Sequence, residues 1–305
     1  KRRNSAGGHM LTDVIRGVTK TIITNETGAE QTFANGLTAF GSDGFTVGSE
    51  SGFNNSSDTF VAWNWKAGTA WSNDASATGV GSLDSSGSKS ATAGFSIISF
   101  TGTESGTPSI AHGLSSTPEF IISKARAITD NWMAFHGSFS AQDYMLFNTT
   151  AAKASASSVW NSLPSSTVIN MGDNAGVNDD GAMIMYAWHS VQGFSKFGSY
   201  TGNANADGNF IYTGFKPAFI LFKGSANTEN WSMYDNKRLG YNVDNNVLYP
   251  NDNSAEGTSD DIDFLSNGFK IRRQTGLLND AQNYIYMAFA ESPFVNSNGV
   301  PTNAR

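Results

Sequence analysis

Two charged pairs with the same spacing are the first candidates for a polar ligand site. Asp13 and Arg16 form one Asp-x-x-Arg pair, and Asp235 and Arg238 form the other. Such a carboxylate and guanidinium can clamp a polar ligand, or they can close a turn as a local ion pair that contributes about 0–1 kcal/mol when exposed. A third copy of the surrounding sequence lacks both charges, which favours the local ion pair. Asp235 and Arg238 are retained as candidate ligand-binding residues.

Two tryptophans at the start of equivalent segments are the second candidates. Trp132 and Trp231 could each present an aromatic platform to a sugar ring. The alternative is a core position at the edge of a β-structure, and His9 takes the same place in the N-terminal copy. The core position is favoured because tryptophan recurs where the copies otherwise diverge. Both tryptophans are retained as candidate ligand-binding residues.

Oxygen-bearing turns raise the question of a calcium site. The stretch Asn203–Gly208 places side-chain oxygens at alternate positions before a glycine, as a calcium loop does. The glutamate expected at the twelfth position is replaced by Gly214, which favours a polar hairpin turn. The acidic turns Asp179–Asp180 and Asp260–Asp263 are open to the same two interpretations.

The remaining sequence carries no motif of known catalysis. The four histidines show no metal-ligand spacing, and the chain has no cysteine, which excludes thiolate metal sites and disulfides. The sequence therefore predicts no metal, no cofactor and no enzymatic activity. A carboxylate pair for glycoside cleavage, assembled from distant strands, stays open as an alternative.

The candidate residues lie within a sequence repeat. Pro217–Lys223 is followed by Trp231–Asp235, and Pro118–Lys124 is followed by Trp132–His136, with the lysine and the tryptophan 8 residues apart in both copies. A third copy begins at Lys1 with the same interval. A repeat of this kind indicates an architecture built from successive similar units.

The fold class follows from short strand-like segments separated by turns. About eight such segments per hundred residues, without a sustained helical stripe, are typical of β-sandwich or jelly-roll proteins. The run Phe219–Phe222 is apolar without alternation, which predicts a strand covered on both faces. We expect an all-β protein of tandem lectin-like sandwiches, in about three copies with the first truncated. The expected division is the C-terminal part of a first repeat (1–68), a linker or opening hairpin (69–92), a second repeat (93–192), a third repeat (193–292) and a C-terminal tail (293–305).

Composition limits the possible partners. Charged residues make up 15% of the chain and the net charge is −7, whereas nucleic-acid binding needs a basic face. We therefore expect no nucleic-acid partner. The longest apolar runs fall well short of the roughly 18 residues that a membrane span needs, so we expect no membrane insertion.

The closing motifs of the copies are the most specific part of the sequence. Phe60–Gly68 and Tyr284–Phe294 contain Ala-Trp or Ala-Phe, and each follows a Gly-Phe turn, at Ser42–Phe45 and Ser266–Phe269. With the lysine-to-tryptophan frame, this order resembles an uncharacterised repeat family of large virion proteins from marine tailed bacteriophages, cyanophages among them. The resemblance covers nearly all of 1–292, although the second copy lacks the Gly-Phe turn. It implies a structural or adhesive virion protein with lectin-like sandwiches, and the family supplies no established binding or catalytic residues.

The functional expectation rests on this resemblance. We expect an exposed virion component, most simply a tail fibre or spike that attaches to the host surface through glycan. A head or tail decoration protein without a ligand is the alternative, and a glycan depolymerase is less favoured. The expected partners are other copies of the chain, with a trimer as the first guess, other virion proteins and a host-surface polysaccharide. Because 1–68 lack the opening of a repeat, we expect them to fold against upstream chain or a neighbouring subunit.

Overall fold

The backbone is almost entirely β-structure, which confirms the all-β prediction. The computed structural model describes residues 1–238, 242, 245–259 and 261–291, so the predicted tail 293–305 lies outside the described residues. Helix in the described part is limited to single turns. These are α1 (Ser51–Asn54), α2 (Ala75–Thr78) and α3 (Ala175–Asn178).

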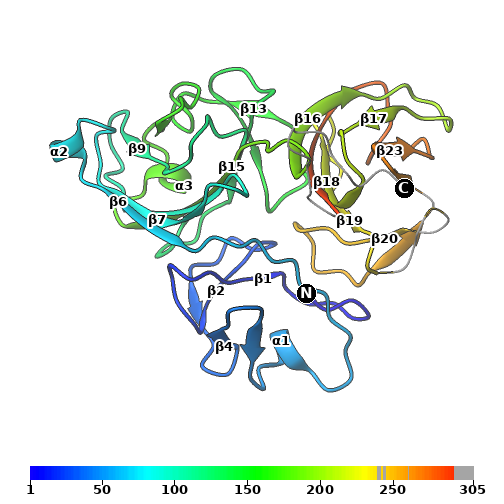
Figure 1. Cartoon of the computed structure of the whole chain (residues 1–305), viewed down its shortest axis with the longest axis horizontal. Helices are drawn as coiled ribbons and strands as arrows, with labels where there is room; N and C mark the ends of the chain where they lie inside the picture. The colour runs from blue at the N-terminus through cyan, green and yellow to red at the C-terminus, as the bar shows by residue number, and fades with distance from the viewer. Residues whose placement is uncertain (239–241, 243–244, 260, 292–305) are drawn as a thin grey trace.

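Three lobes surround a common centre (Figure 1). We call residues 1–68 the N-terminal lobe, 69–192 the central lobe and 193–291 the C-terminal lobe. In the described part of the chain, no helix is long and apolar enough to cross a membrane.

One large antiparallel sheet builds the central lobe. Its eight strands lie in the order β13-β12-β11-β10-β15-β8-β7-β6, and β9 pairs with β14 in a separate sheet. Residues 69–90, expected to be a linker or an opening hairpin, form the paired strands β6 and β7, which extend the large sheet through β8. The strands are β6 (Thr69–Asn73), β7 (Ser85–Ser90), β8 (Phe95–Thr101), β9 (Ser109–Ala111), β10 (Phe120–Ala125), β11 (Met133–His136), β12 (Asp143–Leu146), β13 (Ala154–Ser155), β14 (Val168–Asn170) and β15 (Ala182–Trp188).

Three smaller sheets build the C-terminal lobe. Their orders are β16-β24-β18-β19, β17-β23-β22 and β20-β21. Apolar side chains from the first two sheets meet in a core that belongs to this lobe alone. The strands are β16 (Ser195–Thr201), β17 (Phe210–Tyr212), β18 (Pro217–Gly224), β19 (Ser232–Asp235), β20 (Asn245–Val247), β21 (Gly257–Ser259), β22 (Ile262–Leu265), β23 (Gly268–Ile271) and β24 (Asn283–Ala290).

Strand β18 is buried on both faces, as its unbroken apolar run predicted. Successive side chains of a strand point to opposite faces of its sheet. Phe219 and Leu221 therefore enter a core shared with the central lobe, while Ile220 and Phe222 enter the core of the C-terminal lobe. The four side chains are at most 7% exposed. The strand thus ties two cores together.

The N-terminal lobe consists of two small sheets, β1-β2-β3 and β4-β5. Ile22 of β2 is fully buried in the shared core, and Thr24 Oγ1 donates a hydrogen bond of 2.9 Å to the carbonyl oxygen of Pro250. In the described structure, residues 1–68 thus pack against the other two lobes of their own chain. The strands are β1 (Met10–Leu11), β2 (Lys20–Ile23), β3 (Gln31–Thr32), β4 (Leu37–Phe40) and β5 (Phe45–Val47).

The closing motif Phe60–Gly68 does not form the strand that its counterparts β15 and β24 form. Among the described residues its backbone pairs only with the first residues of the chain, through an isolated bridge between Phe60 and Arg2. Its aromatic side chains instead reach the centre of the molecule. The Trp65 ring lies 5.6 Å from the rings of Phe219 and Phe289 and 6.1 Å from that of Trp188, measured between centroids. All three lobes therefore contribute aromatic rings to one core.

The lysine that ends each repeated strand is buried. Lys124 and Lys223 are fully buried, and each ammonium group donates hydrogen bonds to backbone carbonyl oxygens of a loop. Lys124 bonds to the oxygens of Thr27 and Ile128, so it also joins the N-terminal and central lobes. Burial disfavours the charged form of an amine and lowers the pKa of both lysines from 10.5 to about 8.

These two lysines predict a stability that rises with pH. Between pH 8 and 10.5 the unfolded chain binds more protons than the folded protein, so the free energy of unfolding increases over this window. Above pH 10 the buried phenols of Tyr186 and Tyr234, whose pKa values are raised by burial, oppose the increase. We expect the urea midpoint to rise between pH 8 and about 9.5, where the tyrosines have little effect.

The lysines can be separated from other groups by substitution. Lys124→Met and Lys223→Met should each flatten the dependence of the urea midpoint on pH. Lys237→Met is the matched control, because the Lys237 side chain is 78% exposed. A midpoint that is constant between pH 8 and 9.5 in the unmodified chain would contradict the prediction.

Candidate functional site

The two candidate tryptophans are buried where the lobes meet. Trp132 is 0% and Trp231 is 1% exposed. The indole Nε1 of Trp132 donates to the carbonyl oxygen of Ile23 at 3.3 Å, and that of Trp231 donates to Leu146 at 3.0 Å. Each bond crosses to the neighbouring lobe, so neither ring offers a face to a sugar. We assign both residues to packing between lobes.

The same backbone contact precedes the equivalent strands β1, β11 and β19. In each lobe, the N–H group of the residue before the strand donates to an asparagine side-chain oxygen at 2.8–2.9 Å. The three pairs are His9–Asn25, Trp132–Asn148 and Trp231–Asn251. Burial lowers the pKa of His9 well below its ordinary value, which keeps this side chain neutral like the tryptophans.

A second backbone hydrogen bond joins each lobe to the next and closes the ring. In each case an N–H group donates to a carbonyl oxygen located two residues after the repeated lysine, at 2.7–2.9 Å. The three pairs are Glu30–Arg126, Lys153–Ser225 and Glu256–Arg3. We refer to these contacts as the first, second and third junctions, in that order.

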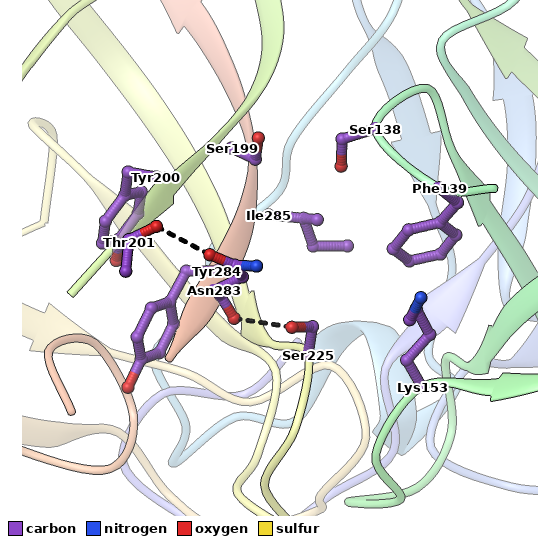
Figure 2. A pocket seen from close by; sticks show the side chains of 10 residues that line it. All are labelled: Ser138, Phe139, Lys153, Ser199, Tyr200, Thr201, Ser225, Asn283, Tyr284 and Ile285. Carbon is purple, nitrogen blue, oxygen red and sulfur yellow. Dashed lines mark hydrogen bonds between the residues drawn. The ribbon is translucent and has the colours of Figure 1, made fainter. Parts of the chain in front are cut away.

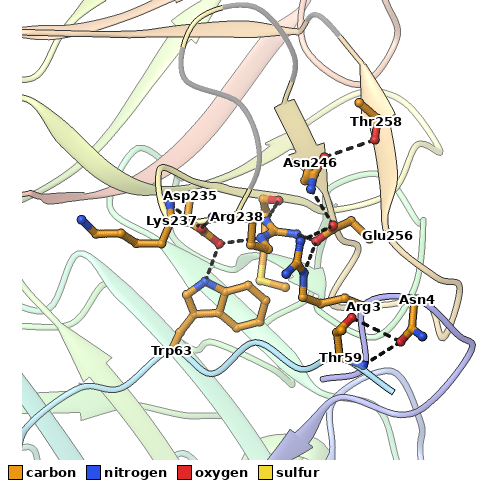
Figure 3. A network of polar contacts seen from close by, with 11 residues as sticks. Arg3, Asn4, Thr59, Trp63, Asp235, Lys237, Arg238, Asn246, Glu256 and Thr258 are labelled. Carbon is orange, nitrogen blue, oxygen red and sulfur yellow. Dashed lines mark hydrogen bonds and ion pairs between the residues drawn. The ribbon is translucent and has the colours of Figure 1, made fainter. Parts of the chain in front are cut away.

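Charged side chains fill the third junction (Figure 3). Glu256 accepts two hydrogen bonds from Arg3, at 2.9 and 3.1 Å, and one from Arg238 at 2.8 Å. Asp235 accepts from Arg238 Nε at 2.7 Å and from Trp63 Nε1 at 3.0 Å. Burial alone would raise the pKa of Asp235, but the Arg238 guanidinium and two backbone N–H groups lower it below the ordinary value. The candidate pair Asp235 and Arg238 is therefore engaged within the protein.

The first junction repeats this network with equivalent residues. Glu30 accepts two hydrogen bonds from Arg126, at 3.0 and 3.1 Å, and forms an ion pair with Arg16 at 3.6 Å. Asp13 pairs with Arg16 and accepts a hydrogen bond of 2.6 Å from the Tyr186 hydroxyl. The Arg16 side chain is 0% exposed. Two junctions are thus closed by alternating carboxylates and guanidinium groups.

The second junction has the backbone contact without the ion network. Lys153 stands in the place of the glutamate, Ser225 in the place of the outer arginine, and Phe139 in the place of the inner arginine. His136 replaces the aspartate and lies with Nε2 3.4 Å from the carbonyl oxygen of Tyr286. Burial lowers the pKa of His136 to about 4, so the ring is neutral at physiological pH. Except at Lys153, neutral side chains therefore occupy positions that charged side chains fill at the other two junctions.

A cavity of about 280 Å³ lies at this second junction (Figure 2). One wall comes from the central lobe and carries Phe139 and Lys153, while the other comes from β16 and β24 of the C-terminal lobe. The complete lining is Ser138, Phe139, Lys153, Ser199, Tyr200, Thr201, Ser225, Asn283, Tyr284 and Ile285. The cavity is therefore our candidate functional site.

Hydroxyl and amide groups give the cavity its polarity. Ser225 Oγ donates to the backbone oxygen of Asn283 at 2.8 Å, and Thr201 Oγ1 donates to Asn283 Oδ1 at 2.7 Å. Among the described residues, Asn283 Nδ2 makes no hydrogen bond, and the lining includes no carboxylate. The site presents hydroxyl oxygens that can accept hydrogen bonds and an amide group that can donate them, beside the partly exposed ring of Tyr200, an arrangement suited to a hydroxylated ligand.

The calcium-like stretch is organised as a turn. Asn203 Oδ1 accepts from the N–H group of Asn205, and Asn205 Oδ1 accepts from that of Asp207. Asp207 also pairs with Lys270 at 2.7 Å. Within the described ranges, no group of three or more His, Asp or Glu side chains is placed to hold a metal ion.

The residues that distinguish the junctions were missed in the sequence. Glu30 follows Asp13 by 17 residues, and Lys153 follows His136 by the same interval, but Glu256 follows Asp235 by 21. The interval is therefore too variable to reveal the position by spacing alone. The residue two places after each repeated lysine was a usable signal, because it is arginine in two copies and Ser225 in the third.

The chain belongs to the family Domain of unknown function (DUF7483), which matches residues 1–293. No curated protein and no solved structure matches the chain.

The ion networks predict a large destabilisation when one carboxylate is removed. Asp235→Asn or Asp13→Asn removes one of the two carboxylates that each buried guanidinium faces and leaves the glutamate alone, so we expect the free energy of unfolding to fall by up to roughly 3–5 kcal/mol. Asp207→Asn is the matched control because its ion pair is on the surface, with the Asp207 side chain 83% exposed, and it should leave the free energy of unfolding almost unchanged. Urea unfolding of the three variants measures the difference. Equal losses in all three would show that the networks do not stabilise the junctions.

Proposed function

We propose that the chain is an exposed, adhesive component of a tailed-phage virion, part of a tail fibre or spike that binds glycan on the host surface. The observation that carries this proposal is the cavity at the second junction. Its hydroxyl and amide groups, set beside the partly exposed ring of Tyr200, match the alternating polar edge and apolar face of a sugar ring. The resemblance of the closing motifs to phage virion repeats supports the same assignment.

The repeated architecture is part of the proposal. We take the chain as three tandem sandwich-type units, within 1–68, 93–192 and 193–292, arranged in a ring. The hydrogen bonds that recur at His9, Trp132 and Trp231 support this arrangement, as do those at the three junctions. Other copies of the chain, in a trimer, and other virion proteins are its proposed partners.

A decoration protein without a ligand is the second candidate. It is favoured by the two junctions that are filled with ion networks and by the burial of Trp132 and Trp231, because these features stabilise the ring without offering a ligand site. A depolymerase is a weaker candidate, since glycoside cleavage needs two carboxyl groups at the bond. Among its described residues, the cavity lining supplies neither.

Binding of the purified chain to arrayed bacterial surface polysaccharides tests the proposal. We expect retention on at least one polysaccharide, with competition by the same polysaccharide in solution. Absence of binding across the array would favour the decoration protein. Reducing ends released from a bound polysaccharide would instead identify a depolymerase.

A further inference from the structure

We infer that the cavity at the second junction takes a sugar residue that bears a carboxylate, with Lys153 as the group that pairs with that carboxylate. This inference rests on the proposed function and adds the class of ligand and the residue that selects it. It comes from comparing three junctions that share a backbone contact and differ in their side chains.

The first and third junctions show what the ring uses to fill this space. In each, a glutamate between two arginines supplies the negative charge, and these glutamate side chains are 10–11% exposed. At the second junction the acid is replaced by Lys153, and the two arginines are replaced by Ser225 and Phe139. The position of the glutamate therefore carries a positive charge. The space that the outer arginine fills at the other junctions is not filled by the smaller Ser225. A ligand carboxylate would bring a second negative charge to Lys153, beside that of Asp143, in the space that Ser225 leaves free.

Lys153 is held at the wall of the cavity. Its ammonium group lies 5.6 Å from the centroid of the Phe139 ring and pairs with Asp143, and the side chain remains 34% exposed. Asp143 is 10% exposed and also accepts a hydrogen bond from the N–H group of Ser140. An ammonium group has three donors, so Lys153 can keep Asp143 and bind a second carboxylate. Lys153 is the one charged residue of the described lining, in a chain with a net charge of −7.

The opposite wall can bind the hydroxyl groups of the same sugar. Thr201 fixes the Asn283 side chain through Oδ1, which identifies Nδ2 as the group left to donate to a ligand. Ser199 and Ser138 add hydroxyl groups on the two sides of the cavity (Figure 2). The volume of about 280 Å³ lies at the lower end of small-molecule sites, which span roughly 300–1,000 Å³. This space suits one ring at the end or branch of a glycan.

Binding of acidic and neutral oligosaccharides distinguishes the ligand classes. The probes are oligomers of galacturonic acid and of glucuronic acid, with neutral glucose oligomers of the same length, measured by isothermal titration calorimetry with the full chain. We expect an acidic oligomer to bind at least about tenfold more tightly than the neutral ones, because charge-assisted hydrogen bonds to Lys153 are lost with the carboxylate. Equal affinity for acidic and neutral oligomers, or no binding of either, would overturn the inference.

The side chains of the first and third junctions provide the variant that tests the site. Lys153→Glu combined with Ser225→Arg installs the glutamate–arginine pair of the other junctions, and the folded double variant should bind no acidic oligomer. Lys153→Gln removes only the positive charge and should weaken acidic oligomers about tenfold, which keeps the inference testable if the double variant does not fold. Lys237→Gln, at a side chain that is 78% exposed, is the control and should bind as the unmodified chain does. Unchanged affinity in folded Lys153 variants would contradict the inference.

The same variants separate this inference from the proposed function. If the unmodified chain and the folded double variant bind arrayed polysaccharides equally, adhesion stands and the cavity is not its site. If the unmodified chain binds no polysaccharide but binds acidic oligomers, the ligand class stands and glycan adhesion fails.

Discussion

The backbone hydrogen bond that joins each lobe to the next is the constraint on which the rest of the structure depends. Three such bonds, at Glu30, Lys153 and Glu256, hold neighbouring lobes together at equivalent points of the backbone, with N–O distances of 2.7–2.9 Å. The side chains beside these bonds must fill the space between the two lobes. Ion networks fill it twice. The second junction, where short or neutral side chains occur at the same positions, retains a cavity.

The architecture could be anticipated in part from the sequence. The apolar run Phe219–Phe222 predicted a strand covered on both faces. An unbroken apolar run places apolar side chains on both faces of a strand, so this prediction needs only the local sequence. The burial of Trp132 and Trp231 was favoured for another reason, since tryptophan recurs at a position where the copies otherwise diverge. The sequence could not predict that Phe60–Gly68 forms no strand, because its motif matches those of β15 and β24. The three segments differ in the parts of the chain that they contact. Pairing between strands is a tertiary property.

The candidate site, like the fold, could be predicted from the sequence only in part. Sequence spacing brought out Asp235 and Arg238 and their counterparts and favoured a local ion pair over a ligand clamp, but it did not predict that the pair is buried. Lys153 and Ser225 were not selected, since a lysine and a serine in polar loops have no distinctive pattern. The role of Lys153 and Ser225 is recognised only by comparison with Glu30 and Arg126, which occupy the equivalent positions at the first junction. A comparison within one chain therefore carried information that neither residue type nor spacing held.

The difference between the second junction and the other two also affects which lobes can join one another. Each junction joins unlike surfaces, and head-to-tail contacts of this kind can form either a closed ring or an open polymer. If the three were alike, a lobe of one molecule could take the place of its counterpart in another. Here such an exchange would set Lys153 beside Arg126, or Glu30 beside a serine, and would leave charges without partners. The charge pattern thus disfavours exchanges that involve the second junction, whereas the first and third junctions, which share a glutamate–arginine network, are alike in charge.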